Sequence, residues 1–399
     1  MNIKNRIIFD LSQARPHRYV GYHGGGVYAY KFFLGLLKEL ESNGQLPRLI
    51  VTFDKSRKLD SQVKDILKDK RIHNVYVESI EDIISTIFAY NSSDSTVILP
   101  MPYKILAKLE KKPESKLIAT IHGLRELQFK KERYLSWYKF PNIVKMLFWW
   151  INSFFKENTT SKMFEYLKIN DQILTDSHFS KKQINKFLDR NSKLLKQNIK
   201  VIYPPISDKY KFNNISKKID YPYFLSVSAS RPVKNCIRVL DAINYYNLFK
   251  AFPDWKYVLT GVNKNLRNLI KYRYKKLYPN LVLFDYITTE KLHELYSQSS
   301  FSVFPSLDEG FGYPIMESYV YGKPIACSNT TSLPEIASDG ADYFNPTNKK
   351  EIFNSLKALI GDEQYRDKLS KNALSQYSII KKESDIKWEQ LFNQILNSN

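Results

Sequence analysis

Short runs of apolar residues alternate along the chain with longer segments in which apolar residues recur every three or four positions. The longer segments, such as the one that ends near Leu40 and the one at 237–249, have the spacing of amphipathic helices. The short runs are predicted strands, at residues 6–11, 49–53, 75–77, 96–99, 117–121, 172–176, 200–203, 223–228, 256–261, 281–285 and 301–304. Strands that alternate with helices in this way are typical of α/β proteins.

The most informative stretch runs from Phe301 to Pro324 and predicts a strand, a loop, a helix and a second strand. Pro314 suits the first turn of the helix, where its missing N–H costs nothing. In an open α/β sheet, ligands bind beyond the carboxyl ends of the strands, which is where this loop lies. Glu309 in the loop and Glu317 in the helix can accept hydrogen bonds from sugar hydroxyls. The alternative interpretation of the same spacing is that Glu309 is a solvated loop residue and that Glu317 only stabilises the N-terminus of the helix.

Other loops with chemical potential also follow predicted strands. A glycine cluster after the first strand suits close approach to a phosphate or a sugar, although a tight turn would explain it too. His122 directly follows the strand at 117–121, and Arg231 and Lys234 follow the strand at 223–228. Two cations in such a loop suit a diphosphate. The alternatives are a structural role for His122 and ordinary surface positions for Arg231 and Lys234. Ser177 is expected to cap the helix that follows the strand at 172–176.

These motifs resemble those of a known family, the retaining glycosyltransferases called glycosyl transferases group 1. The stretch from Glu309 to Pro314, followed by Glu317, is similar to the E-x7-E signature of that family. Three further stretches resemble the family and follow its order along the chain, namely Ser226–Asn235, Thr260-Gly261 and Ser328–Ile336.

The resemblance implies a GT-B fold, in which two Rossmann-like domains face each other across a cleft. It also implies that a hexose moves from a nucleotide-diphosphate sugar to an acceptor hydroxyl, with retention at the anomeric carbon and without a metal ion or other cofactor. By resemblance, Arg231 and Lys234 stabilise the diphosphate leaving group, and Glu309 and His122 contact the transferred sugar. The donor-binding residues implied in the same way are Gly24, Gly25, Gly26, Tyr286, Ile287, Gly310, Phe311, Gly312 and Glu317.

The length of 399 residues fits two domains better than one core. We predict an N-terminal, acceptor-side domain at residues 1–205, a linker at 206–222 and a nucleotide-sugar domain at 223–377. A C-terminal helix at 378–399 packs back towards the first domain by resemblance. Cys236 and Cys327, the two cysteines, belong to no metal or disulfide-exchange pattern, which fits a reducing compartment. No signal peptide and no spanning helix are expected, so the protein is predicted to be cytoplasmic.

The net charge of +21 indicates an anionic partner or surface. Between Gln128 and Lys162, seven basic and ten aromatic residues stand against two acidic ones, which is the composition of an interfacial membrane anchor. An ordinary packing region, or a stacking surface for single-stranded nucleic acid, is the alternative. We expect a peripheral protein on an anionic membrane surface, at the inner face of the cell membrane. Its acceptor is expected to be a glycan or lipid-linked glycan in cell-surface polysaccharide assembly.

Two rival functions remain open from the sequence. A nucleic-acid-binding module is suggested by the charge alone, and because no recognised binding motif accompanies it, no nucleic-acid partner is expected. A GT-B relative with different chemistry, such as a sugar-nucleotide epimerase or a phosphorylase, would share the same motifs. Analysis of the products separates these activities from transfer.

Overall fold

The computed structural model describes residues 5–12, 16–17, 21–22, 24–54, 61–124, 160–167, 171–191, 198–208 and 219–397. These residues form two compact units. Unit 1 contains the described residues up to Pro205 and those from Glu383 onward, and unit 2 contains those from Ile206 to Lys382. Most of the basic, aromatic stretch that begins at Gln128 lies outside the described residues, as does the central part of the predicted linker.

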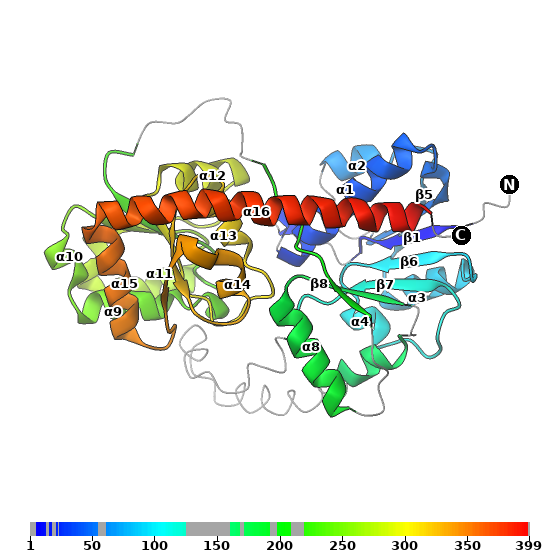
Figure 1. Ribbon diagram of the computed structural model, residues 1–399, viewed down its shortest axis with the longest axis horizontal. Coiled ribbons are helices and arrows are strands. Elements are labelled where there is room, and N and C mark those ends of the chain that lie inside the picture. Colours follow the sequence, from blue (N-terminus) through cyan, green and yellow to red (C-terminus); the bar gives the residue numbers. More distant parts are fainter. Residues whose placement is uncertain are drawn as a thin grey trace. The chain divides into compact units, whose positions relative to one another are not determined.

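Unit 1 is built on a seven-stranded parallel sheet in the order β5-β4-β1-β6-β7-β8-β9 (Figure 1). Its strands are β1 (Ile7–Asp10), β4 (Leu49–Asp54), β5 (His73–Val77), β6 (Thr96–Leu99), β7 (Lys116–Thr120), β8 (Gln172–Thr175) and β9 (Ile199–Val201). Its other elements are α1 (Gly24–Ser42), α2 (Ser61–Ile66), α3 (Ile80–Ala89), α4 (Tyr103–Leu106), α8 (His178–Arg190), the 3-10 turn η1 (Leu46–Arg48) and a small hairpin of β2 (Pro16–His17) and β3 (Gly21–Tyr22).

Unit 2 is built on a six-stranded parallel sheet in the order β12-β11-β10-β13-β14-β15. Its strands are β10 (Tyr223–Ser226), β11 (Lys256–Leu259), β12 (Leu281–Leu283), β13 (Phe301–Phe304), β14 (Ile325–Ser328) and β15 (Ala341–Phe344). Its helices are α9 (Cys236–Tyr245), α10 (Leu248–Ala251), α11 (Lys264–Arg273), α12 (Thr289–Gln298), α13 (Tyr313–Tyr319), α14 (Leu333–Ala337) and α15 (Lys349–Gly361), with 3-10 turns η2 (Pro232–Lys234), η3 (Lys275–Asn280) and η4 (Ser338–Gly340).

Both faces of each sheet are buried, as the continuous apolar runs of the strands require. In β1, Ile7 and Phe9 belong to one core cluster and Ile8 to another. In β10, Phe224 lies in one cluster of unit 2, while Tyr223 and Leu225 lie in a second one. Because successive side chains of a strand point to opposite faces, each sheet is packed on both sides.

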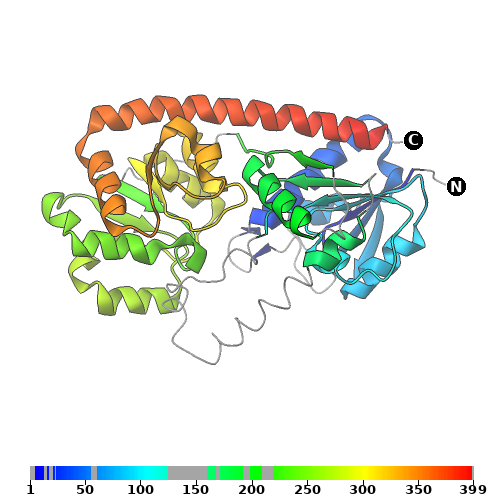
Figure 2. The same ribbon diagram turned by 60° about the horizontal axis from the view of Figure 1, so that its bottom comes forward.

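The last helix, α16 (Glu363–Leu396), begins in unit 2, and its residues from Glu383 belong to unit 1. Figure 2 shows it as one unbroken helix. Within unit 1, the Trp388 indole donates to the Tyr203 carbonyl at 2.9 Å and its ring lies 4.7 Å from that of Phe32. Gly35 of α1 leaves room for Phe392 of α16, since a Cβ there would lie 2.6 Å from Cζ of Phe392.

Two predicted details differ in the structure. The single helix predicted at 237–249 is divided into α9 and α10, because Asn247 adopts a left-handed conformation with φ of 52°. The cluster Gly24, Gly25 and Gly26 is not a loop before the helix but the first turn of α1 itself. Within the described residues, no helix combines the length and the apolar character that crossing a membrane requires.

Candidate functional site

Each sheet has one place where the strand order reverses, and that place defines a candidate site. In unit 2, β10 pairs on one side with β11 and on the other with β13. The loops that follow β10 and β13 therefore leave the sheet edge next to each other and run in opposite directions. In unit 1 the corresponding reversal lies between β1 and β6. Ligands of open α/β sheets bind at these positions.

An ion pair joins the two loops at the reversal point of unit 2. Lys234 Nζ lies 2.7 Å from Glu309 Oε1, and the two side chains are only 6% and 12% exposed. The ammonium group also lies 4.3 Å from the centroid of the Phe304 ring. Two predicted site residues are thus brought together, and each neutralises the charge that the other would otherwise carry into a buried environment.

The Lys234 loop is held by the residue that follows it. Asn235 has a φ of 55°, a left-handed conformation that asparagine tolerates. Its amide donates to the carbonyls of Pro305 and Pro346 at 3.0 and 2.9 Å. In addition, the Leu307 N–H donates to the Val233 carbonyl at 2.9 Å. The loops after β10, β13 and β15 are therefore fixed to one another by the Asn235 side chain and by a main-chain hydrogen bond.

The Glu309 loop is held from its other side by the segment before α14. The Ser332 hydroxyl lies 3.0 Å from the Glu309 carbonyl and 3.1 Å from the Phe311 carbonyl, and donates to them. The Glu309 N–H donates to Thr331 Oγ1 at 3.3 Å. The motif at Ser328–Ile336 thus shapes the neighbouring loop through its hydroxyl groups, and Gly310 lies within the loop that it shapes.

Gly312 is required at the start of α13. Its φ is 107°, a conformation that side chains with a Cβ rarely adopt. A Cβ there would lie 3.0 Å from Leu333 Cδ2 and 3.2 Å from Ile315 Cδ1, so the space is filled as well. This glycine lets the chain turn directly from the Glu309 loop into the helix that carries Glu317.

Arg231 differs from Lys234 although both lie in the same loop. Its side chain is partly exposed, and among the residues that the structure describes none accepts a hydrogen bond from its guanidinium or forms an ion pair with it. Lys234 is buried and neutralised by Glu309. Of the two predicted phosphate-binding cations, Arg231 therefore has the charge that is open to a ligand, whereas Lys234 keeps the carboxylate of Glu309 in place.

Glu317 accepts a hydrogen bond from the phenol of Tyr296 on α12. The distance from the Tyr296 hydroxyl to Glu317 Oε2 is 2.9 Å. Burial raises the pKa of Tyr296 well above its ordinary value, and the Glu317 carboxylate raises it further. The phenol therefore stays protonated and orients one carboxylate oxygen.

Tyr286 and Ile287 lie in the loop between β12 and α12. Ile287 packs against the core cluster of unit 2 that contains Tyr223 and Leu295. The expected role of this loop is main-chain contact, and its charged side chain, Asp285, forms an ion pair with Arg267 at 2.8 Å. It stays a prediction that these two residues contact the donor.

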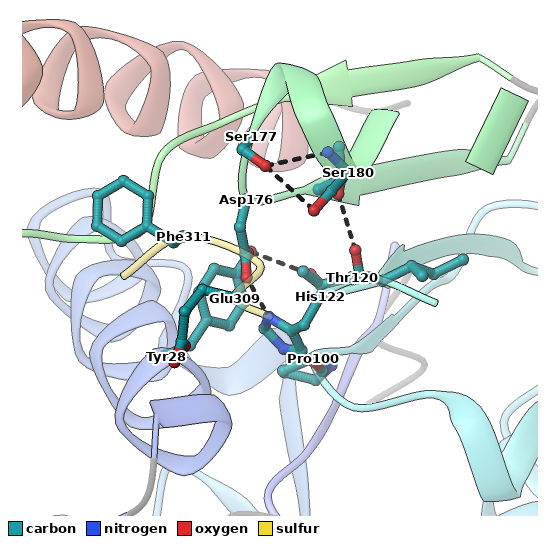
Figure 3. A network of polar contacts seen from close by, with 12 residues as sticks. Tyr28, Pro100, Thr120, His122, Asp176, Ser177, Ser180, Glu309 and Phe311 are labelled. Atoms are coloured by element: carbon teal, nitrogen blue, oxygen red, sulfur yellow. Dashed lines mark hydrogen bonds and ion pairs between the residues drawn. The ribbon is translucent and has the colours of Figure 1, made fainter. Parts of the chain in front are cut away.

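In unit 1, His122 follows β7 and is held at both ring nitrogens (Figure 3). Its Nδ1 lies 2.8 Å from Asp176 Oδ2, and its Nε2 lies 2.9 Å from the Pro100 carbonyl oxygen. The Tyr28 ring packs against the imidazole in a T-shaped arrangement, with a centroid distance of 4.7 Å. Asp176 is buried at the end of β8, and the next residue, Ser177, caps α8 as predicted by accepting from the Ser180 N–H.

The structure also brings the glycine cluster close to His122. A Cβ at Gly25 would lie 3.1 Å from Met101 Cε and 3.9 Å from His122 Nε2. Because the first four N–H groups of a helix have no partner within it, the glycines of this first turn present main-chain donors beside the histidine. Asp176 and Pro100 were not predicted, since neither lies within a motif and Asp176 is 54 positions from His122. Their one signal was position, since Pro100 follows the predicted strand at 96–99 and Asp176 ends the predicted strand at 172–176.

Comparison with known proteins identifies a family and a fold that this chain is similar to. Residues 208–376 match the profile of the family described as Glycosyl transferases group 1. The O-antigen chain mannosyltransferase RfbU of Salmonella typhimurium is 28% identical over 215 residues, which cover 51% of this chain and 55% of that protein. The matches span about half the length, or less, of the curated relatives.

Solved structures extend the likeness to nearly the whole chain. Sucrose-phosphate synthase from Thermosynechococcus elongatus matches 99% of this chain and 100% of its own, with a TM-score of 0.71 and 13% identity. Anabaena HepE in complex with UDP-glucose matches with a TM-score of 0.62 and 15% identity, over 99% of this chain and 100% of its own. At these identities the two structures show the fold alone, and they confirm the predicted GT-B class with its two Rossmann-like sheets. The likeness to the glycosyl transferases group 1 family is therefore carried by residues 208–376, which make up less than half of the chain.

Proposed function

We propose that this protein is a retaining hexosyltransferase, which moves a sugar from a nucleotide-diphosphate donor to a glycan acceptor without a metal ion. The observation that carries the proposal is the arrangement at the reversal point of unit 2. There a buried Lys234–Glu309 pair is fixed between two loops, and Arg231 in the same loop has no partner among the described residues. The open charge of Arg231 suits the anionic diphosphate of a donor. The Glu309 carboxylate, which Lys234 holds in place, suits the hydroxyl groups of the attached sugar.

In the proposed reaction, the bond between the anomeric carbon and the diphosphate oxygen breaks while the acceptor oxygen bonds to that carbon. The nucleoside diphosphate leaves with the electron pair, and the proton of the acceptor hydroxyl passes to the departing oxygen. Negative charge develops on the diphosphate, and the positive charge of Arg231 stabilises it. Glu309 and Glu317 accept hydrogen bonds from hydroxyl groups of the sugar and the ribose.

The acceptor is proposed to be a lipid-linked glycan of a cell-surface polysaccharide, reached at an anionic membrane surface. The likeness to the O-antigen chain mannosyltransferase RfbU supports a polysaccharide product and makes mannose the first donor sugar to test. The likeness to HepE, whose structure holds UDP-glucose, makes that nucleotide sugar the second. Membrane contact rests on the composition of the basic, aromatic stretch that begins at Gln128, most of which lies outside the described residues.

The test is a donor screen followed by product analysis. Ligand at about 100 times its dissociation constant should stabilise the protein by roughly 2.7 kcal/mol, which a thermal-shift assay detects. With a lipid-linked glycan as acceptor, donor should be consumed in proportion to the acceptor that is glycosylated, and the new linkage should have the anomeric configuration of the donor. A product that forms without acceptor would identify an epimerase. A reaction that needs inorganic phosphate would identify a phosphorylase.

Addition of EDTA provides a second test. Since Arg231 supplies positive charge for the diphosphate, activity should be unchanged when divalent ions are removed. Activity that disappears with EDTA and returns with manganese or magnesium would contradict the metal-independent part of the proposal.

A further inference from the structure

The hydrogen bonds around His122 restrict where its protons lie. The Pro100 carbonyl oxygen, 2.9 Å from Nε2, can only accept a hydrogen bond, so Nε2 must carry a hydrogen. The Asp176 carboxylate, 2.8 Å from Nδ1, also only accepts when it is ionised. One further proton must therefore lie between Nδ1 and Asp176 Oδ2, since two bare acceptors would repel each other at this distance.

That shared proton belongs to the imidazole. In model peptides an imidazole is more basic than an aspartate carboxylate by about 2.5 pKa units. With Nε2 already protonated, a proton on Nδ1 makes His122 an imidazolium that is paired with an Asp176 carboxylate. Both ring nitrogens then act as donors, and neither has a lone pair with which to take a proton from an acceptor hydroxyl.

The surroundings of the pair support this charge state. From the neighbouring elements, Asp176 of the β8–α8 turn and Tyr28 of α1 face the ring. Burial raises the pKa of Tyr28 well above its ordinary value, and Asp176 raises it further, so Tyr28 remains a neutral phenol beside the ring. Asp176 Oδ1 is buried without a hydrogen-bond partner among the described residues. The carboxylate charge therefore has the imidazolium as its compensating group.

We propose that Asp176 is a positioning residue that keeps His122 as an imidazolium, so that His122 presents the positive end of a buried ion pair to the transfer reaction rather than acting as a base. The charge state of His122 follows from its hydrogen bonds alone, whereas its effect on sugar transfer rests on the proposed function. Gly25, at the positive N-terminal end of α1, lies beside the same ring, so the helix dipole adds to the positive potential at this edge of unit 1.

The first test measures the protonation of His122 directly. Ring nitrogen-15 chemical shifts are recorded in protein that carries labelled histidine, and the His122 signals are identified by their loss in His122→Gln. We expect both ring nitrogens to be protonated from about pH 6 to about pH 8, well beyond the range of a free imidazole. A neutral His122 near pH 7 in the wild-type protein would overturn the proposal, whatever the variants do and whether or not any sugar is transferred.

The second test uses Asp176→Asn, with Asp189→Asn on the exposed side of α8 as the matched control. The amide introduced at position 176 can donate to Nδ1, so this variant accommodates a neutral imidazole without losing the hydrogen bond. We expect kcat to fall about tenfold or more near pH 8, to recover towards pH 6, and the donor KM to change little. Asp189→Asn should behave like the wild-type protein. A folded Asp176→Asn protein with wild-type kcat near pH 8 would overturn the proposal.

The two readouts separate this inference from the proposed function. If His122 is an imidazolium in the wild-type protein and becomes neutral in Asp176→Asn, the positioning role of Asp176 stands. If no combination of donor and acceptor then yields a glycoside, the transferase proposal fails while the charge state of His122 is still established.

Discussion

Each sheet edge carries an ion pair between two loops, but the two pairs respond differently to pH. In unit 2, Lys234 and Glu309 join loops that leave two strands on either side of the reversal point. In unit 1, His122 and Asp176 join the turns after the neighbouring strands β7 and β8. A lysine and a glutamate keep their charges throughout the neutral pH range, whereas a histidine does so only while its partner favours the proton.

This difference shows how one architecture can separate two tasks. The pair of unit 2 locks the shape of a loop and leaves Arg231 as the charge that is open to a ligand. The pair of unit 1 sets the protonation of a side chain. Variants that remove one partner should therefore produce a pH-independent loss of stability in unit 2 and a pH-dependent effect in unit 1.

The largest effect is expected from Glu309→Gln. Removing one partner of a buried ion pair leaves the other charge unpaired, which costs about 3–5 kcal/mol. Unfolding in urea should show this loss, whereas Glu290→Gln on the exposed part of α12 should change stability by less than about 0.5 kcal/mol. The double variant Lys234→Met with Glu309→Gln should regain much of the stability but not the activity. A wild-type urea midpoint for Glu309→Gln would show that the stability of the fold does not depend on the Lys234–Glu309 ion pair.

A smaller loss is expected from Gly312→Ala. The φ of 107° and the close contacts of a Cβ with Leu333 and Ile315 should cost about 1–3 kcal/mol. Gly361→Ala is the control, because its Cβ would meet Phe252 at an ordinary contact distance of 3.6 Å and its φ is not positive. Equal urea midpoints for the two alanine variants would contradict the strain assigned to Gly312.

The smallest effect is expected from Tyr296→Phe. Loss of the hydrogen bond to Glu317 should cost about 1 kcal/mol. Because the pKa of Tyr296 is raised well above its ordinary value, the phenol keeps its proton from about pH 6 to about pH 9, and the loss should be the same across this range. Urea unfolding at several pH values measures it. A loss that changed with pH in this range would contradict the raised pKa of Tyr296.

The sequence predicted most of unit 2 because its important residues are close together along the chain. Phe301–Phe304 is a strand as predicted, and the helix that begins beside Pro314 carries Glu317. The pairing of Lys234 with Glu309 was not predicted, although both residues were. That pairing depends on β10 and β13 being neighbours in the sheet, and strand order cannot be obtained from local periodicity.

Unit 1 was less accessible from the sequence for a related reason. His122 was predicted as a site residue, but its partner Asp176 lies 54 positions away and had no motif to mark it. The contact exists because β7 and β8 are adjacent and both end at the same edge. Helix boundaries were missed where a single residue decides them, as at Asn247, whose left-handed conformation separates α9 from α10.

The central claim, that Arg231 provides the charge that binds the donor diphosphate at the edge of unit 2, is tested most directly by calorimetric titration. The nucleotide-diphosphate sugar found in the donor screen is titrated into the wild-type protein, into Arg231→Gln and into the surface control Lys250→Gln. We predict that Arg231→Gln binds the donor about 10–100 times more weakly, which corresponds to about 1.5–3 kcal/mol for a hydrogen bond to a charged group. The free nucleoside, which lacks the diphosphate, should bind all three proteins alike. Wild-type affinity for the donor in Arg231→Gln would contradict the role assigned to this arginine.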